Sequence, residues 1–562
     1  MVNAKTDPSS KDLLLHKSNI KYYSSLEDKI PEQHIKHVVI ICPEDDFDSS
    51  KPNELDLDSF DELSYYKHVI DIAKLSYPII ASEFLQNVLL IVSIYFVGNL
   101  GKDELAACAL ASTWFNIWNA MMLGMMSPTD TFLSQTYGSK NYSLYGVWAA
   151  NSVIVTIIAT VPIAGLVALC GPVMEFIGRE TELAHAAGSF ATRLVPGLLP
   201  YFLFKVLTKY LYVLAFNETY SHSLLSNAQY CTFRQAQNIL APSIWIGIIA
   251  NAFNISINWL LIYRFGWGVD GSPWATNFTR AAQFVFLAGY ILAKKKDDQT
   301  WLNFSCKNMS YEVMQPFYAL ALPGTIATSA QMWMGEALTL LASALGTNAL
   351  DAHTIVGNLC TFLFLSFPMA IGIGASIRVG QLIGSQRPVD AKKCFHASMF
   401  LCISTQSALI VSLYSCKKWL SRLFTNDDEV SSIVLHLLSI MFIIMLGDTI
   451  NVTIGGVLRG LGKQNWYLMS NLIPSWLFAI PMSIIFAFKM SLGIEGLWWG
   501  MLLGTYSSSV VGLIVMHWFV NWEDEAHQSL ERLSSIGQLS KSSKMTCSLT
   551  SVSSIFTVAE SF

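Results

Sequence analysis

The 562-residue chain is poor in charge, because Asp, Glu, Lys and Arg make up only 13% of it. A soluble globular protein carries roughly 25%. The ten cysteines include no C-x-x-C pair, so neither a zinc site nor a disulfide framework is indicated. The sequence also lacks a nucleophile–base set and a phosphate-binding glycine loop, which argues against an enzyme and against ATP-driven transport. It has no basic footprint for nucleic acid.

Apolar residues are abundant instead, at 52% of the chain with a mean hydropathy of +0.43. A helix crosses a bilayer with about 20 apolar residues. Runs of about this length lie at 77–97, 105–128, 148–170, 190–211, 240–263, 272–293, 316–341, 350–373, 395–415, 432–453, 466–488 and 494–518. The sequence therefore predicts an all-α membrane protein with twelve transmembrane helices.

Polar stretches flank these runs. Residues 1–66 hold seven Lys and fourteen Asp or Glu, a net −7 of the total −5, so the rest of the chain carries +2. They contain no apolar run long enough for a signal peptide. We expect 1–66 to be a disordered, acidic cytosolic tail and 521–562 to be a Ser-rich cytosolic tail.

The two halves of the chain repeat each other. Tyr77-Pro78 matches Leu322-Pro323 at an offset of 245, and Gln135–Ser139 matches Gln381–Ser385 at 246. Duplicated halves are typical of secondary transporters with a central binding site. The repeat predicts two pseudo-symmetric six-helix lobes, over 67–300 and 301–520.

Later in the repeat the offset falls from 250 to 227, which exposes 23 extra residues at 212–234. This insertion is either a natural cytosolic loop or a gene-model artefact such as a retained intron, in preference to an additional helix.

Positive charge in short loops marks the cytosolic side of a membrane protein. The loops at 294–296, 387–393 and 459–463 are rich in Lys and Arg and fall on one side if both termini are cytosolic. Lys417, Lys418 and Arg422 depart from this pattern. The plasma membrane and a vacuolar or endolysosomal membrane are both compatible with the sequence.

A series of short motifs, in order along residues 68–530 and interrupted at 212–234, resembles the multidrug and toxic compound extrusion (MATE) transporters, especially their eukaryotic branch. The motifs are Val97–Gly101 with Glu104–Ala107, Thr129–Thr131 with Gln135 and Gly138, Leu207–Leu211, Trp333 with Glu336, Ala375–Gly380, Gly455–Gly460, and Gly496–Trp498 with Asn521–Glu525. The resemblance implies an antiporter that exports small organic compounds, such as organic cations, metabolites or xenobiotics. Protons or Na⁺ would move in exchange by alternating access, with no cofactor beyond that ion gradient.

The resemblance also implies a site for substrate and coupling ion in the C-terminal lobe. The family pattern Glu-Trp-Trp-x-x-Glu in the seventh helix places its second Trp at Trp333 and its second Glu at Glu336. Gln331 replaces the first Glu. The acid of the tenth helix falls at Asp448, eleven residues before Arg459.

Two positions on the eighth helix also differ from the family. Asn358 stands where some animal members have a Glu. His353 stands where these proteins usually have Gln. A histidine there could titrate near neutral pH, or could be a buried neutral ring held by one hydrogen bond.

Ionisable residues at membrane depth are costly and usually face a cavity or a partner. Glu336 lies about thirteen residues into its helix, and Asp448 lies near the middle of its own. Either carboxylate could carry a proton or a substrate cation, or could be satisfied by a neighbouring Ser, Thr or Asn. Trp333 could hold an organic cation over its ring.

Other charged residues in the spans receive structural interpretations. We expect Glu83 to snorkel toward the interface and Lys205 and Lys209 to act as interfacial anchors. Arg378 and Arg459, near helix ends, are interpreted as structural or gating residues.

The predicted partners are a small organic substrate and the lipid bilayer, without nucleic acid, for a chain that acts as a monomer. Two alternatives stay open. One is a related lipid or oligosaccharide flippase, which would be expected to have a more cationic cavity. The other is a transport-inactive regulatory membrane protein, which Gln331 and the 212–234 insertion make plausible.

Overall fold

The computed structural model describes residues 65–178, 180–215, 229–293, 300–304, 311–424 and 427–542, and every regular element within these ranges is helical. The predicted acidic tail lies outside the described residues up to 64, as do residues 543–562 of the predicted Ser-rich tail. Of the predicted insertion, 212–215 and 229–234 are helical, and 216–228 lie outside the described residues.

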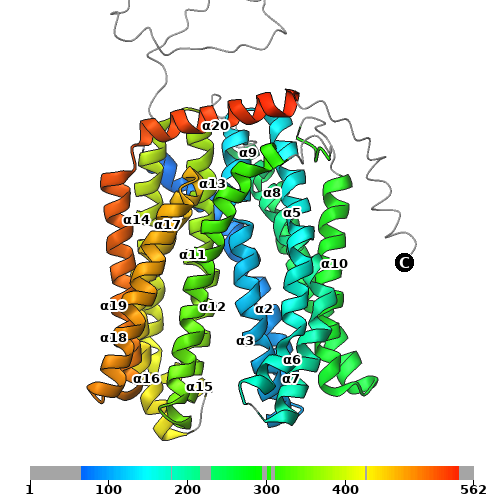
Figure 1. The fold of residues 1–562 in the computed structure, drawn as a ribbon, viewed down its shortest axis with the longest axis vertical. Helices are drawn as coiled ribbons and strands as arrows, with labels where there is room; N and C mark the ends of the chain where they lie inside the picture. The colour runs from blue at the N-terminus through cyan, green and yellow to red at the C-terminus, as the bar shows by residue number, and fades with distance from the viewer. Residues whose placement is uncertain are drawn as a thin grey trace, which may run out of the picture. The chain divides into compact units, whose positions relative to one another are not determined.

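The first half of the chain passes six times between the two ends of the bundle (Figure 1). The passes are α2 (Tyr65–Gly98), α3 (Lys102–Met125) with α4 (Ser127–Gly138), α5 (Tyr142–Ala168), α7 (Thr181–Leu194) with α8 (Leu198–Ala215), α9 (Gln229–Trp259), and α10 (Gly271–Ala293). A short helix, α6 (Cys170–Phe176), joins α5 to α7. We call this half the N-lobe.

The second half repeats the plan and forms the C-lobe. Its passes are α11 (Tyr311–Ser343), α12 (Thr347–Ser366) with α13 (Pro368–Gly384), α14 (Pro388–Ser415), α16 (Asp428–Leu461), α17 (Gln464–Leu472) with α18 (Ile480–Ile484), and α19 (Gly493–Ile514). The short helix α15 (Lys417–Phe424) joins α14 to α16. The predicted twelve transmembrane helices in two lobes are confirmed.

The chain then forms one more helix, α20 (Trp522–Ser542), which lies across one end of the bundle (Figure 1). We call this the α20 end and the opposite one the far end. Ala526, Ser529 and Leu533 share one face of α20, and each is less than 5% exposed. This packed amphipathic helix differs from the polar Ser-rich tail that was expected from residue 521 onward.

The repeat predicted from the sequence is present in the backbone. Helices α4 and α13 end at Gly138 and Gly384, which are the fourth residues of the two Gln-x-x-Gly motifs. Two residues later, Lys140 and Gln386 both adopt the left-handed conformation, with φ of 58° and 59°. This conformation is uncommon for residues other than glycine, so its recurrence at the same offset confirms the duplication.

The two Gln-x-x-Gly motifs cross each other between the lobes. A Cβ added to Gly138 would overlap the carbonyl oxygen of Gln381, and one added to Gly384 would overlap that of Gln135. Close approach of helix backbones through small residues is a common way to pack membrane helices. The glycines therefore allow α4 and α13 to meet backbone to backbone.

The glutamines of the same motifs bind the opposite lobe. Gln135 of the N-lobe donates its Nε2 to the carbonyl oxygen of Gly460 at 2.9 Å. Gln381 of the C-lobe donates its Nε2 to the carbonyl oxygen of Val213 at 3.2 Å. Both amides are buried, so each hydrogen bond is formed away from water. The lobes are thus joined near the α20 end by two pairs of contacts related by the repeat.

Replacing Gly138 with Ala should destabilise the protein, because its methyl group has no room beside Gln381. Overpacking of this kind costs about 1–3 kcal/mol. We expect a lower thermal unfolding midpoint for the purified chain in detergent, and the same for Gly384→Ala. Gly165→Ala in α5 is the control, because nothing lies within 4 Å of its added Cβ. Equal midpoints for all three variants would contradict this account of the crossing.

Candidate functional site

Glu336 lies on α11, half-buried, and has no hydrogen-bond or ion-pair partner among the residues that the structure describes. One turn earlier, Trp333 donates its indole Nε1 to the carbonyl oxygen of Ile117 in α3, at 3.1 Å. Residues three apart share a helix face. Glu336 therefore lies on the side of α11 that faces the N-lobe, one turn from an interlobe hydrogen bond in the direction of the far end.

Asp448 lies on α16, also half-buried, next to the Thr505 side chain of α19. Cys360 of α12 and Tyr506 of α19 lie close to the same carboxylate. Asp448 is thus inside the C-lobe, where three helices meet. Within the described part of the chain, no contact joins it to Glu336.

His353 of α12 contacts both α11, which carries Glu336, and α19, which lies beside Asp448. Its Nε2 lies 3.1 Å from the Thr339 hydroxyl, which is one turn beyond Glu336 on α11. Its ring packs edge-on against Trp498 at 5.7 Å, and the residue is only 8% exposed. This is the geometry of a buried histidine held by one hydrogen bond, the second of the two predicted possibilities.

Gln331, which replaces the family's first Glu, has a structural partner. Its Oε1 accepts a hydrogen bond from the Tyr467 hydroxyl of α17 at 3.1 Å. The Gln331 side chain is therefore held against α17 within the C-lobe. A carboxylate here would also find this phenolic donor.

Asn358 is exposed on α12 and is not brought to the predicted acids by any described contact. It shares an exposed helix face with Asp351, Thr354 and Thr361. Polar groups of membrane helices rarely face lipid. One residue after Thr361, the Phe362 ring meets Phe84 of α2 at 5.3 Å, so this stripe lies beside the seam with the N-lobe.

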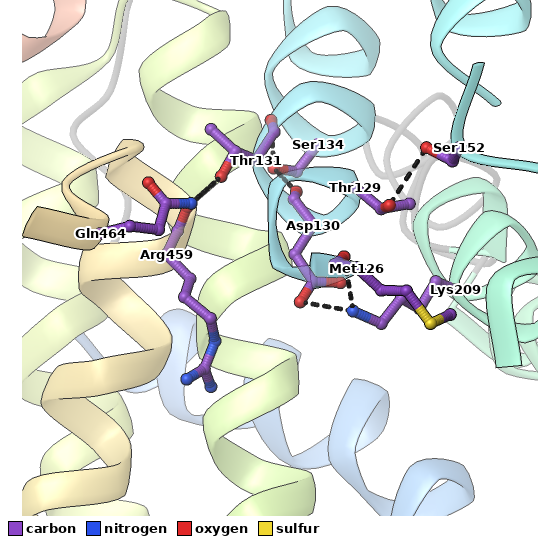
Figure 2. Close-up of polar contacts among 9 residues, drawn as sticks. All are labelled: Met126, Thr129, Asp130, Thr131, Ser134, Ser152, Lys209, Arg459 and Gln464. Atoms are coloured by element: carbon purple, nitrogen blue, oxygen red, sulfur yellow. Dashed lines mark hydrogen bonds and ion pairs between the residues drawn. The ribbon is translucent and has the colours of Figure 1, made fainter. Parts of the chain in front are cut away.

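Two lysines expected as interfacial anchors form ion pairs inside the N-lobe instead. Lys205 lies 3.0 Å from Glu83, and both side chains are less than a fifth exposed. Lys209 lies 3.0 Å from Asp130 of α4 (Figure 2). The expectation that Glu83 snorkels to the interface is wrong as well, because α8 supplies a cation at the same depth.

The Thr129–Thr131 triplet of α4 contacts three different helices through consecutive side chains (Figure 2). Asp130 faces the N-lobe, whereas Thr131 faces the C-lobe, where it also donates to the carbonyl oxygen of Arg459. The side-chain partners of the triplet are Ser152 of α5 at 3.1 Å, Lys209 of α8 at 3.0 Å and Gln464 of α17 at 3.0 Å. The motif therefore joins the lobes near the α20 end.

Further interlobe contacts escaped the sequence analysis. Arg378, which was interpreted as structural or gating, lies 3.9 Å from Asp71 of α2. His68 of α2 lies 3.6 Å from Asp390 of α14. Each pair joins residues more than 300 positions apart, so no local spacing could have revealed it.

Comparison with known proteins agrees with this architecture. The sequence model of the MatE family matches residues 78–215 and 323–485, together more than half of the chain. Human "Multidrug and toxin extrusion protein 2" is 28% identical over 445 residues, which cover 76% of this chain and 73% of that protein. "Protein DETOXIFICATION 16" of Arabidopsis thaliana is 26% identical over 467 residues, covering 82% and 90%.

Among solved structures, the "Crystal structure of eukaryotic MATE transporter AtDTX14" superposes with a TM-score of 0.74 at 24% identity. The superposition covers 84% of this chain and 99% of the AtDTX14 chain, so the two have the same fold. Family match, relatives and fold agree over both lobes. The chain belongs to the MATE family and is a multi-pass membrane transporter of organic compounds, not an enzyme.

Proposed function

We propose that this transporter is a secondary-active antiporter that exports small organic cations in exchange for protons or Na⁺. One observation carries the proposal above the others. Glu336 is a half-buried carboxylate at membrane depth with no basic partner among the described residues, on the face of α11 turned toward the N-lobe. The names of the relatives, which refer to multidrug and toxin extrusion, support organic compounds as the cargo.

A carboxylate without a fixed counter-ion can couple two ligands by competition. Glu336 can hold a proton or neutralise an organic cation, but a neutral carboxylic acid attracts the cation far less. Each ligand therefore weakens the other, which is the coupling that an antiporter needs. The Trp333 ring, one turn away, offers an aromatic face of the kind that binds organic cations.

Asp448 supplies the second acid of the C-lobe. The Thr505 side chain of α19 lies beside this carboxylate. We assign it the coupling ion, since Cys360 and Tyr506 leave it a confined position inside the lobe. Because Gln331 and Asn358 are neutral, Glu336 and Asp448 carry the coupling without further acids of the family pattern.

The proposed orientation places the α20 end in the cytosol, together with both termini. The short turns at this end carry Lys140, Arg387 and Lys463, in accord with the excess of positive charge in cytosolic loops. The crossing of α4 and α13 then closes the cytosolic side, which corresponds to an outward-facing state. We propose that the chain works as a monomer in the plasma membrane or in a vacuolar or endolysosomal membrane.

Glu336→Gln should abolish proton-coupled transport, because glutamine can neither release a proton nor neutralise a cation. In proteoliposomes with a pH gradient, we expect gradient-driven movement of a fluorescent organic cation to fall roughly 5- to 150-fold, the usual range of such coupling. Glu312→Gln is the matched control, since Glu312 lies exposed in the first turn of the same helix.

Wild-type coupling in the Glu336→Gln variant would refute the role of this residue. If the unmodified protein moves no organic cation under any gradient, the result supports a transport-inactive regulatory protein. If it moves a fluorescent lipid but no cation, the result supports a flippase. Size-exclusion chromatography of each variant separates these results from misfolding.

His353→Gln should retain most transport, whereas His353→Leu should lose much of it. Glutamine can keep the hydrogen bond to the Thr339 hydroxyl, whereas leucine removes it and leaves Thr339 bonded only to the Gly335 carbonyl. A hydrogen bond contributes about 0.5–1.5 kcal/mol. The same cation efflux assay, run across a range of pH, provides the measurement. Loss of pH dependence in His353→Gln alone would show instead that the imidazole titrates during the cycle.

A further inference from the structure

Arg280 is a buried cation in the interior of the N-lobe. It lies about ten residues into α10 and is 5% exposed. Its guanidinium carbon lies 4.9 Å from the ring centre of Phe115 in α3 and 4.6 Å from that of Tyr201 in α8. One of its terminal nitrogens, Nη1, is buried without a hydrogen-bond partner.

The carboxylates of the N-lobe are engaged elsewhere or lie at the far end. Ion pairs are described for four of them: Asp71 with Arg378, Glu83 with Lys205, Asp130 with Lys209, and Asp270 with Arg193. Asp103, Glu104, Glu175, Glu180 and Glu182 lie in or next to the far-end turns and short helices. Among the residues that the structure describes, no acid therefore neutralises Arg280.

Tyr201 brings a second cation close to Arg280. Its side chain is an electrostatic neighbour of both Arg280 and Lys205, which is one helical turn farther along α8. Lys205 is paired with Glu83, so these four residues carry a net charge of +1. We call Glu83, Tyr201, Lys205 and Arg280 the N-lobe cationic cluster. The Lys205 and Glu83 side chains are 16% and 18% exposed, so this pair is the less deeply buried part of the cluster.

The geometry leaves one part of the guanidinium unused. Aromatic rings interact with the flat faces of the cation, whereas its N–H donors point outward in the plane of the group. The rings of Phe115 and Tyr201 therefore offset part of the cost of burial but satisfy none of the donors. The group that fits such an edge is a planar carboxylate, which a guanidinium binds with two parallel hydrogen bonds.

We propose that Arg280 binds the carboxylate of an organic substrate, with Lys205 as the second cation of the N-lobe cationic cluster. This proposal rests on the transport function proposed above and narrows its substrate class. The chain would then accept organic cations that also carry a carboxylate, with an anion-binding group in the N-lobe and the acids Glu336 and Asp448 in the C-lobe. An inorganic anion such as chloride shares this chemistry and is distinguished below.

The test compares two dyes that differ in one charge: a rhodamine with a free carboxylate and the ethyl ester of the same rhodamine. Fluorescence anisotropy gives the affinity of each dye for the purified full chain in lipid nanodiscs. We expect Arg280→Gln to weaken binding of the acid at least tenfold, about 1.4 kcal/mol, and to leave the ester within twofold. Lys417→Gln is the matched control, since Lys417 also lies over a ring, that of Tyr414 at 4.3 Å, but outside the N-lobe.

A graded variant covers the case in which Arg280→Gln does not fold. Arg280→Lys keeps the charge but loses the two-pronged geometry, so the acid should bind several-fold more weakly and the ester as before.

Equal losses for acid and ester, no loss for either, or no binding of the acid to the unmodified chain would each overturn the proposal. A chloride result could overturn it as well. If chloride stabilises the unmodified chain but not Arg280→Gln, and does not compete with the acid dye, the site holds an inorganic anion only. Transport of the ester in proteoliposomes is scored separately. Its failure would contradict the proposed antiport, whereas the anisotropy result decides the anion site.

Discussion

The crossing of α4 and α13 is the contact on which the arrangement of the two lobes depends. Gly138 and Gly384 have no Cβ, and this lets the backbone of each helix reach the carbonyl oxygen of the other. Gln135 and Gln381 then each donate to a carbonyl of the opposite lobe. Two copies of one four-residue motif therefore determine both how close the helices lie and which way they face.

The same crossing explains why α20 lies where it does. The Gln135 side chain has a carbonyl oxygen left after its amide has bonded to Gly460. Ser529 and Arg532 of α20 both donate to that oxygen, at 3.1 Å and 3.2 Å. The amide nitrogen of Gln135 thus bonds to the opposite lobe, and its amide oxygen bonds to α20.

Because the chain has few charged residues, a charged side chain inside a lobe that has no ion-pair partner points to a function. Several charges inside the lobes have a partner at about 3 Å, as Lys205 has in Glu83. Among the described residues, Glu336 and Asp448 in the C-lobe have no ion-pair partner, and neither has Arg280 in the N-lobe. Arg459 of the C-lobe lies over the Tyr467 ring. The two lobes share a fold but differ in the balance of these charges, and substrate chemistry is expected to follow that balance.

The sequence alone predicted the twelve passes well, because runs of about 20 apolar residues have few other uses. The repeat offset of 246 also matched Gln135–Ser139 with Gln381–Ser385, the segments that end just before the left-handed residues Lys140 and Gln386. Partners on different helices escaped prediction, since Glu83 and Lys205 of the N-lobe lie 122 positions apart and approach only after folding. Helix α20 was missed although Ala526, Ser529 and Leu533 recur at helical spacing, because its many polar residues resemble those of a tail.

The site residues divide in a similar way. Family motifs placed Glu336 and Trp333 on one helix face, and the structure agrees. No motif indicated Arg280, because a single arginine in an apolar run carries no information until its neighbours are known. Its significance comes from Phe115 and Tyr201, which belong to two other helices.

Alternating access requires the α20 end to open, and the bonds of α20 indicate how. To the C-lobe it is held by the Glu525–Lys463 ion pair at 2.9 Å, with Glu525 only 4% exposed, and by the Gln386 amide, which donates to the Ala526 carbonyl at 2.7 Å. On the N-lobe side, Ser529 and Arg532 share one acceptor, the Oε1 of Gln135. A buried ion pair is costly to break, whereas a shared acceptor can be exchanged for water. Opening is therefore easier if the N-lobe leaves and α20 stays with the C-lobe, so that the closing helix moves as part of one lobe.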